Sequence, residues 1–390
     1  DVFNGDHPAF YPAAVPGASL ASRRRSKLTN LRQPNSTPFQ EAVSLKKAGI
    51  VTFHNAENYG AALQTYALMK TLEALDLDVR VVDYRNRGVF NRNLLKNLFY
   101  LLTFQNPFRN HKGFHNFQNK FLKLTEKTYR NPASFEQDAE QFDLLFFGSD
   151  QIWNPDLADG FDPLYFGNFQ TKARKIAYAA SLGKDQISSR QREQLNALVA
   201  HLDAIGVREE TMLPLIDRGA TCVVDPCMLL SAEAWREIAD NSHPYDNFIF
   251  IYQLFRNPQV METAIKLRKQ FNKEVLILSP YPLPFHQQGI HKLGRITPKE
   301  FVGFYNRAGA VLSDSLHGTL FSILFEKPFY TFLPGAKTGR ITSLLKKLGL
   351  SDRIVSTQNL PGQEIDFSSV NPLVAREVQN SLTFIRRNIQ

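Results

Sequence analysis

The sequence predicts an α/β protein with two doubly wound domains, each built on a parallel sheet that helices cover on both faces. The first observation is a regular alternation of short apolar runs and longer amphipathic runs from about Lys46 onwards. This pattern is typical of strands and helices that follow one another along a parallel sheet. The second observation is the length of 390 residues, which is long for one core and suits two domains of ordinary size.

The alternation divides the chain into segments. We assign residues 46–226 to the first domain, with a basic insertion at 85–130, and residues 227–370 to the second domain. Residues 371–390 are predicted to form a helix that packs back on the first domain, and residues 1–45 are expected to be disordered or loosely attached. The predicted strands are 48–53, 79–84, 144–147, 176–180, 204–207, 248–252, 274–278, 309–312 and 329–332. The predicted helices are 61–75, 190–202, 259–270, 298–307, 319–325, 341–348 and 373–386.

The composition is that of a soluble globular protein, with 43% hydrophobic and 21% charged residues. No apolar run approaches the roughly 18 residues that a membrane span needs, and no secretory signal is recognisable. The chain opens with Asp1 rather than Met, so we expect a fragment or a processed form. Cys222 and Cys227 lack CxxC spacing and are interpreted as reduced, buried thiols of a cytoplasmic protein, not as a disulfide or metal site.

The most informative motif is residues 313–319, SDSLHGT, between two apolar runs. It predicts a buried strand, a tight polar turn and a helix with His317 in its first turn. Such a turn presents unpaired N–H groups and a positive dipole end, which favour a phosphate or a carboxylate. The histidine adds a group that can move protons near neutral pH. The alternative is a capped helix whose histidine fills a polar gap.

Three other stretches place small or polar residues after an apolar run, at the edge where open α/β sheets bind ligands. They are residues 58–64 (NYGAALQ), 146–154 (FFGSDQIWN) and 206–210 (GVREE), and each is expected to lead from a strand into a helix. Arg208 could bind a phosphate or carboxylate through both of its terminal nitrogens, or it could form a salt bridge with Glu209 or another acid.

In this order, with YAAS at 178–181 between them and a late Arg340-containing segment, these stretches resemble the polysaccharide pyruvyl transferase family. The resemblance runs from about Lys46 to about Leu350. It implies two Rossmann-like domains facing a cleft, a GT-B-like architecture, with the C-terminal helix crossing between them. One position departs from the family, because many members carry an arginine two residues before the histidine, where this chain has Ser315.

The resemblance also implies a function. The family transfers a pyruvyl group from phosphoenolpyruvate to two hydroxyls of a sugar, in a polysaccharide or lipid-linked saccharide such as an exopolysaccharide of the cell envelope, and forms a ketal. It implies His317 for proton transfer and Arg208 for the donor anion, with no cofactor besides the donor and no metal. Asp150 is expected to orient sugar hydroxyls or act as a base, or else to cap the next helix. The expected substrate-binding residues are Asn58, Gly60, Ser149, Ser313, Ser315, Lys337 and Arg340.

Two other functions stay open at this point. The two-domain cleft also suits a GT-B glycosyltransferase with a nucleotide-sugar donor, and the net charge of +9 is compatible with a non-enzymatic nucleic-acid-binding protein. No GxGxxG follows a strand, no P-loop motif occurs, and the histidines lack metal-ligand spacing, so nicotinamide, flavin, P-loop nucleotide and structural zinc sites lack support. No nucleic-acid motif is recognisable either, and we expect no nucleic-acid partner.

The basic insertion contains ten Lys or Arg side chains and one acid, together with Phe and Leu at helical spacing (94, 95, 98, 101 and 102, then 114, 117, 121 and 124). This predicts two amphipathic helices. They could lie against an anionic membrane or a polyprenyl-linked acceptor, at the inner face of the cell membrane. Alternatively, their apolar residues could pack on the first domain and leave the cations solvated.

Overall fold

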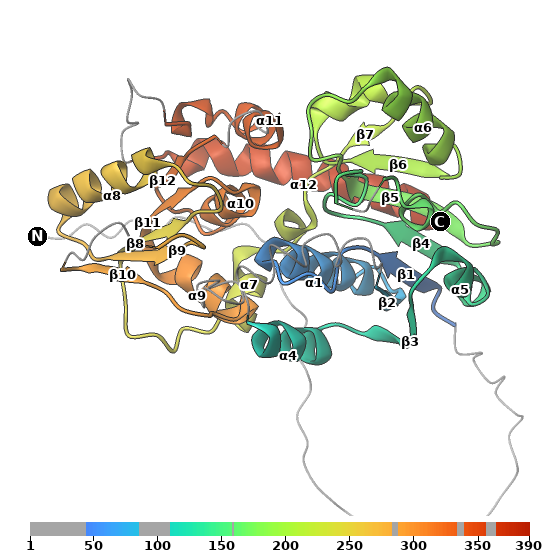
Figure 1. Ribbon diagram of the computed structural model, residues 1–390, viewed down its shortest axis with the longest axis horizontal. Helices are drawn as coiled ribbons and strands as arrows, with labels where there is room; N and C mark the ends of the chain where they lie inside the picture. Colours follow the sequence, from blue (N-terminus) through green and yellow to red (C-terminus); the bar gives the residue numbers. More distant parts are fainter. Residues whose placement is uncertain (1–43, 86–109, 158–159, 283–287, 334–338, 356–363) are drawn as a thin grey trace, which may run out of the picture. The chain divides into compact units, whose positions relative to one another are not determined.

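The computed structural model describes residues 44–85, 110–157, 160–282, 288–333, 339–355 and 364–390. Residues from Leu45 to the C-terminus form one compact unit (Figure 1). The N-terminal segment 1–43, residues 86–109 of the basic insertion, with its first expected helix, and Lys337 lie outside the described residues.

The first sheet contains seven parallel strands in the order β3-β2-β1-β4-β5-β6-β7. The chain starts beside the centre, winds to one edge, returns and continues to the other edge. The direction reverses between β1 and β4, and open α/β sheets bind ligands outside the carboxyl ends of the strands at such a switch point. The strands are β1 (Lys47–Val51), β2 (Asp78–Tyr84), β3 (Leu124–Tyr129), β4 (Leu144–Phe147), β5 (Arg174–Ala180), β6 (Ala204–Val207) and β7 (Thr221–Cys222).

The second sheet repeats this arrangement with five parallel strands in the order β10-β9-β8-β11-β12. Its switch point lies between β8 and β11. The predicted fold of two doubly wound parallel sheets is therefore confirmed. The strands are β8 (Phe248–Tyr252), β9 (Val275–Leu278), β10 (Ile290–Lys292), β11 (Ala308–Ser313) and β12 (Phe329–Thr331).

Helices lie on both sides of each sheet (Figure 1), and the alternation of side chains along β8 shows why. Side chains of a strand point alternately to opposite faces, so Ile249 and Ile251 pack in one apolar cluster with α8, while Phe248 and Phe250 pack in another with α9. The α-helices are α1 (Tyr59–Glu73), α4 (His111–Phe121), α5 (Pro132–Glu136), α6 (Ser189–Val199), α7 (Ala232–Ile238), α8 (Pro258–Phe271), α9 (Pro298–Arg307), α10 (Leu316–Leu324), α11 (Gly339–Lys347) and α12 (Phe367–Ile389).

Local sequence signals account for many of the helix boundaries. Helices α6 and α9 each begin with a capping box, in which the side chains of the first and fourth residues bind each other's backbone N–H groups. Asn58 caps α1, because its Oδ1 accepts a hydrogen bond from the N–H of Ala61. Each cap satisfies an N–H group that has no partner within its own helix.

Two expectations about local structure were wrong. No helix follows β4 directly, because Asp150 has a φ of 71° and residues 151–154 form a turn before Pro155. A left-handed residue followed closely by proline does not continue into a helix. In addition, Leu124 begins the edge strand β3 and is not part of an amphipathic helix.

The two sheets share one apolar cluster, which includes residues of β1, α1, β8, α9 and α10. Within it the ring of Tyr59 stacks on Phe301 with centroids 4.6 Å apart, and its hydroxyl donates to the carbonyl of Ile296. Helix α1 is thus packed directly against α9, which covers the second sheet. This apolar contact places the first turn of α1 beside the carboxyl edge of the second sheet.

Helix α12 contacts elements from both halves of the chain. Near its start, Asn371 donates to Glu326, which follows α10, and near its end the ring of Phe384 lies 6.4 Å from that of Tyr178 in β5. Between them, the hydroxyl of Ser381 accepts a hydrogen bond from the N–H of Val224. The helix is drawn along both sheets in Figure 1.

The described half of the basic insertion packs on the protein. Phe114 and Phe117 of α4 are 1% and 3% exposed, and their rings contact Tyr59 and Tyr66 of α1. The apolar face of α4 is therefore covered by α1, as in the second of the two interpretations. Among the described residues, no helix is both long and apolar enough to cross a membrane.

We expect Phe117→Ala to destabilise the protein by about 3 kcal/mol, because it removes a buried ring and leaves a cavity. Asn116→Ala on the exposed side of the same helix is the matched control and should change the free energy of unfolding by no more than a few tenths of a kcal/mol. Urea unfolding at constant pH measures both. Equal stability of the two variants would mean that α4 is not part of the core.

Candidate functional site

The turns at the two switch points meet in space. Helix α1 follows β1, and α10 follows β11, so both helices begin at the carboxyl edge of their sheet. Gly60 in the first turn of α1 lies against the imidazole of His317 in the first turn of α10, since a Cβ on Gly60 would be 2.1 Å from Nδ1. Both helix N-termini therefore present unpaired N–H groups and positive dipole ends close to one histidine.

The other ring nitrogen of His317 faces a buried carboxylate. Nε2 lies 3.4 Å from Oδ2 of Asp225, a residue with a 2% exposed side chain. Asp225 precedes the short helix η4 (Pro226–Leu229), and its Oδ1 accepts a hydrogen bond from the N–H of Cys227. Burial opposes ionisation of Asp225, but His317, Arg208 and that N–H outweigh it and hold the pKa of Asp225 well below its ordinary value.

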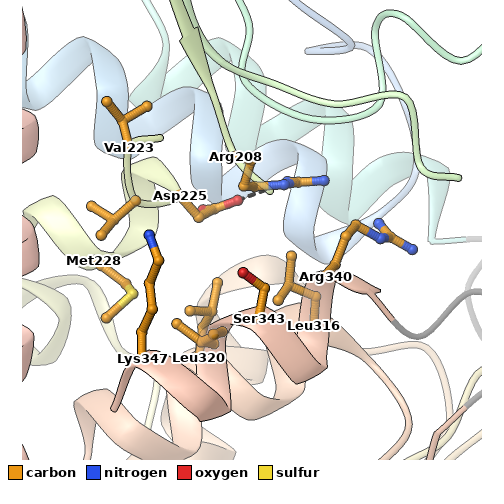
Figure 2. A pocket seen from close by; sticks show the side chains of 11 residues that line it. Arg208, Val223, Asp225, Met228, Leu316, Leu320, Arg340, Ser343 and Lys347 are labelled. Atoms are coloured by element: carbon orange, nitrogen blue, oxygen red, sulfur yellow. Dashed lines mark hydrogen bonds and ion pairs between the residues drawn. The ribbon is translucent and has the colours of Figure 1, made fainter. Parts of the chain in front are cut away.

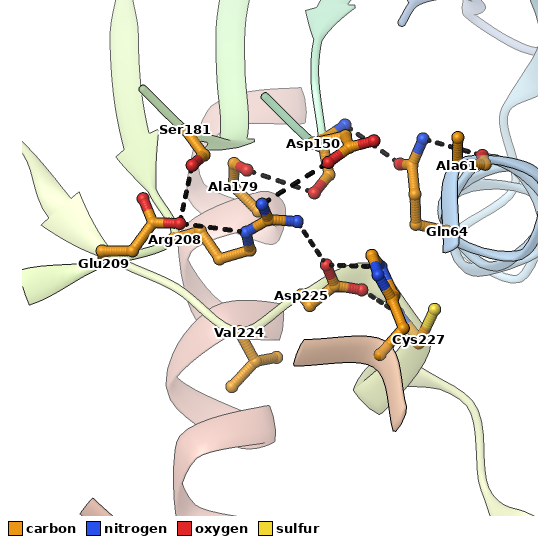
Figure 3. A network of polar contacts seen from close by, with 12 residues as sticks. Ala61, Gln64, Asp150, Ala179, Ser181, Arg208, Glu209, Val224, Asp225 and Cys227 are labelled. Atoms are coloured by element: carbon orange, nitrogen blue, oxygen red, sulfur yellow. Dashed lines mark hydrogen bonds and ion pairs between the residues drawn. The ribbon is translucent and has the colours of Figure 1, made fainter. Parts of the chain in front are cut away.

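Arg208 lies at the centre of the polar cluster in Figure 3. It follows β6, and its side chain is 4% exposed. NH1 donates to Asp225 at 2.8 Å, Nε donates to Glu209 at 3.2 Å, and NH2 lies 3.5 Å from Asp150. Burial disfavours the charged guanidinium, yet the attraction of Glu209, Asp225 and Asp150 raises its pKa above the ordinary value. The alternative of a salt bridge to neighbouring acids is therefore present in the structure.

Ser149 and Asp150 lie at the carboxyl end of β4. Ser149 is fully buried, its hydroxyl donates to the carbonyl of Ala179, and its N–H donates to the side chain of Gln64. Asp150 and Ala179 both have left-handed backbone conformations, with φ of 71° and 51°. Such conformations cost of order 1 kcal/mol or more for residues other than glycine, and they cluster at functional sites.

The residues of the SDSLHGT motif have different surroundings. The hydroxyl of Ser313 donates to the carbonyl of Tyr252 and accepts from the N–H of Ser315. Ser315 precedes α10, is 5% exposed, and makes no side-chain cap. Asp314 turns away from His317, because its two carboxylate oxygens accept the N–H groups of Leu254 and Phe255 in the loop after β8. Asp314 thus ties together the turns on either side of the second switch point.

A small cavity lies beside the cluster (Figure 2). Its wall combines Arg208 and Asp225 from the first half of the chain with Leu316, Arg340 and Lys347 from the second. Burial and the nearby Arg208 both lower the pKa of Arg340. The volume of about 30 Å³ has room for little more than water, so a larger anion requires movement of the long side chains on this wall.

The structure therefore brings together Gly60, Asp150, Arg208, His317 and Arg340. Asn58 and Ser149 lie at the carboxyl edge of the first sheet, but their side chains form hydrogen bonds with nearby backbone groups, the N–H of Ala61 and the carbonyl of Ala179.

Sequence reasoning missed Asp225, although it carries the same signal as the other site residues. It is an acid directly after the apolar pair Val223 and Val224, and we interpreted it only as the end of the first half. Glu209 was considered only as a partner for Arg208. Its proximity to Arg208 is local, whereas the proximity of Asp225 to Arg208 and His317 depends on tertiary contacts.

Asp225, Cys227 and His317 also place potential metal-ligand atoms within 4.8 Å of one another. The chemistry of this set does not favour a cation. Both oxygens of Asp225 already accept hydrogen bonds, one of them from the permanently charged Arg208. In addition, burial raises the pKa of the Cys227 thiol well above its ordinary value, and only the thiolate is a good metal ligand.

The fold and the site define a protein with two Rossmann-like domains and a GT-B-like arrangement, whose polar cluster joins the carboxyl edges of the two sheets. The chain belongs to the polysaccharide pyruvyl transferase family, whose model matches residues 58–334. The resemblance inferred from the sequence motifs is thus confirmed, and with it a transferase class of enzyme. Among curated proteins, none shows significant sequence similarity to this chain.

Several solved structures have a similar arrangement at very low sequence identity. UDP-GlcNAc 2-epimerase from Methanocaldococcus jannaschii is 11% identical with a TM-score of 0.47, covering 87% of this chain and 93% of its own. The Neisseria meningitidis UDP-GlcNAc 2-epimerase bound to UDP-GlcNAc is 11% identical with a TM-score of 0.48, and the match covers 88% of this chain and 99% of that protein. Arabidopsis thaliana UGT89C1 complexed with UDP-L-rhamnose is 10% identical with a TM-score of 0.47, and the match covers 89% of this chain and 94% of that protein. Values this low say nothing about substrate or mechanism.

The buried carboxyl of Asp314 predicts a pH-dependent stability. Burial raises its pKa from 3.8 to about 6, although the N–H groups of Leu254 and Phe255 oppose the shift. The folded state therefore favours the protonated carboxyl, and stability present below pH 3.8 is lost as the pH rises through about 6. At one pKa unit per 1.36 kcal/mol, the loss is about 3 kcal/mol.

Asp314→Asn should remove this pH dependence, because the amide keeps the shape of the carboxyl group but does not titrate. Its oxygen can accept only one of the two N–H groups, which lowers the stability of the variant by an amount that does not change with pH. Urea unfolding of both proteins from pH 4 to 7 gives the difference in the free energy of unfolding. We expect the variant to gain on the wild type as the pH rises. A difference that stays constant over this range would contradict the assignment.

Proposed function

We propose that this protein transfers the pyruvyl group of phosphoenolpyruvate to two hydroxyl groups of a saccharide, forming a ketal and releasing phosphate. The observation that supports it most is the meeting of two helix N-termini at His317, next to Arg208 and Arg340. The donor carries a phosphate and a carboxylate and must be protonated on carbon. A proton-transfer group within an anion-binding environment suits both requirements.

In the first step, His317 gives a proton to the methylene carbon of the donor, and the electrons of the double bond form the new C–H bond. Positive charge develops on the carbon that bears the phosphate. The first sugar hydroxyl attacks that carbon, and its proton returns to His317. In the second step, a second hydroxyl of the sugar attacks the same carbon, the bond to phosphate breaks with its electron pair, and the hydroxyl proton leaves with phosphate.

Departure of phosphate needs positive charge where negative charge develops. We assign this role to Arg340 and to the N–H groups in the first turn of α10. Ser315, which replaces the family's usual arginine, brings no charge, so the donor phosphate depends more strongly on these other groups. NH2 of Arg208 makes no hydrogen bond among the described residues, and we assign it to the donor anion. Lys337 stays a proposed further contact.

The acceptor side is assigned to the carboxyl end of β4. Asp150 is proposed to orient the sugar hydroxyls, because its carboxylate lies at the sheet edge 3.5 Å from Arg208. We propose that Asn58, Ser149 and Ser313 shape the site through their backbone contacts, since their side chains bind neighbouring segments.

Incubation of the protein with phosphoenolpyruvate and a panel of galactose, mannose and N-acetylhexosamine acceptors tests this function. We expect release of phosphate together with a ketal product. His317→Ala should lower kcat by on the order of a hundredfold or more, as for loss of a general acid/base. The exposed His201→Ala is the control. Activity of His317→Ala within a few-fold of wild type would make His317 a structural residue. Consumption of a nucleotide sugar with phosphoenolpyruvate inert would indicate a glycosyltransferase.

We further propose that the acceptor belongs to a polysaccharide or lipid-linked saccharide of the cell envelope, and that the protein works at the cytoplasmic face of the membrane. The family and the exposed cations of α4, such as Lys112 and Lys120, support this. The protein should sediment with anionic vesicles at low salt and be released by salt, because each surface cation near such lipid contributes about 1 kcal/mol. Equal recovery in the supernatant with and without vesicles would contradict this location.

A further inference from the structure

We propose that Asp225 is the positioning residue of His317, and that it makes Nδ1 the ring nitrogen that transfers protons. The expected loss of kcat rests on the proposed function, whereas the expected tautomer of His317 does not. The imidazole has two nitrogens. When one of them is hydrogen-bonded to a neighbouring group, the other is the one that can exchange a proton with the substrate. The geometry of the buried cluster decides between them.

The Nε2 atom of His317 faces the carboxylate of Asp225. It lies 3.4 Å from Oδ2 of Asp225, and it is buried with no other polar partner among the described residues. An ionised carboxylate only accepts hydrogen bonds, so Nε2 must carry a hydrogen to satisfy this contact. NH1 of Arg208 and the N–H of Cys227 both donate to this carboxylate, which keeps it ionised also when the ring is neutral. Nε2–H pointing at Asp225 is therefore the favoured arrangement in every protonation state of the ring.

The carboxylate of Asp225 is itself held by two hydrogen bonds. Asp225 cannot rotate freely, because Oδ1 accepts the N–H of Cys227 at 3.0 Å and Oδ2 accepts NH1 of Arg208 at 2.8 Å. Its side chain is 2% exposed, so water does not compete for these contacts. Arg208 is held in turn by Glu209. The direction from which Asp225 faces His317 is thus set by groups of the first half of the chain.

One face of the imidazole ring of His317 lies against Gly60. A Cβ on Gly60 would lie 2.1 Å from Nδ1, 2.4 Å from Cε1 and 2.6 Å from Cγ of His317. These similar distances show that Gly60 packs over the ring face near Nδ1. Only a residue without a side chain permits this contact. Asp225 and Gly60 together therefore fix the ring, and Nδ1 makes no hydrogen bond to a described residue.

Proton bookkeeping agrees with this assignment. The imidazolium carries hydrogens on both nitrogens. Nδ1 gives its hydrogen to the methylene carbon of the donor and then accepts one from the first sugar hydroxyl. Nε2 keeps its hydrogen on Asp225 throughout, so Asp225 stabilises the imidazolium without becoming protonated.

Long-range nitrogen–proton NMR spectra of the wild-type protein, labelled with nitrogen-15 in histidine, test the structural part directly. Comparison with His317→Ala assigns the signals, and a pH series separates the neutral ring from the imidazolium. We expect the neutral ring to be the Nε2–H tautomer. A neutral ring with its hydrogen on Nδ1 would overturn the proposal, whatever reaction the protein catalyses.

Two truncations then separate positioning from general stabilisation of Arg208. Asp225→Ala and Glu209→Ala each remove one carboxylate from Arg208, but only Asp225 faces His317. Asp225→Ala should abolish the tautomer preference and lower kcat by about a hundredfold with the donor KM changed only a few-fold. Glu209→Ala should keep the wild-type tautomer. Loss of the preference in both variants, or in neither, would overturn the role of Asp225.

Gly60→Ala provides a variant that leaves every charge in place. The new Cβ must displace the ring, so we expect shifted His317 signals and reduced kcat. Gly294→Ala is the matched control, because a Cβ there meets no atom within 4 Å. If the His317 signals of Gly60→Ala match those of wild type, Gly60 does not fix the ring. Absence of pyruvyl transfer by the wild type would refute the proposed function but leave the tautomer result intact.

Discussion

The buried guanidinium of Arg208 connects the segments that make up the site. Its nitrogens face carboxylates from three places in the first half: Asp150 after β4, Glu209 after β6 and Asp225 before η4. A cation that is almost fully removed from water requires such partners, because the loss of hydration costs several kcal/mol. Each carboxylate is thereby held in one orientation, and Asp225 in turn orients the ring of His317 through its contact with Nε2.

The polar cluster can act on His317 only because the two sheets are held edge to edge. The apolar stack of Tyr59 on Phe301 packs α1 against α9, and this brings the N-terminus of α1 to that of α10. The glycine at position 60 then lets the imidazole lie on the helix without a clash. An apolar contact thus sets the distance between the halves, and polar contacts set the orientation of the reactive groups.

Strong local patterns explain where sequence prediction succeeded. The bounds of β4, β6, β8 and α9 agree with the predicted runs, since each is a continuous apolar or amphipathic stretch closed by polar residues. The edge strands β3, β7 and β10 were missed. In β3 most residues are exposed or half-buried, β7 has two residues and β10 has three, so none of these strands carries an apolar run. Leu124 was assigned to a helix because β3 has no apolar run that would indicate a strand, and the helical spacing of Leu124 from Phe121 and Phe117 was the only remaining signal.

The sequence by itself determined the fold class, the family, the position of Arg208 directly after a strand and that of His317 in the first turn of a helix, because these depend on local periodicity and on motifs. The tertiary structure alone decided what surrounds them. Asp225 faces His317, although four of the five strands of the second sheet lie between these two residues in the sequence. Arg208 binds the same carboxylate. Local pattern carries no information on such contacts, since the contact of Arg208 with Asp225 needs the folded first half, and the contact of His317 with Asp225 needs the two sheets packed together.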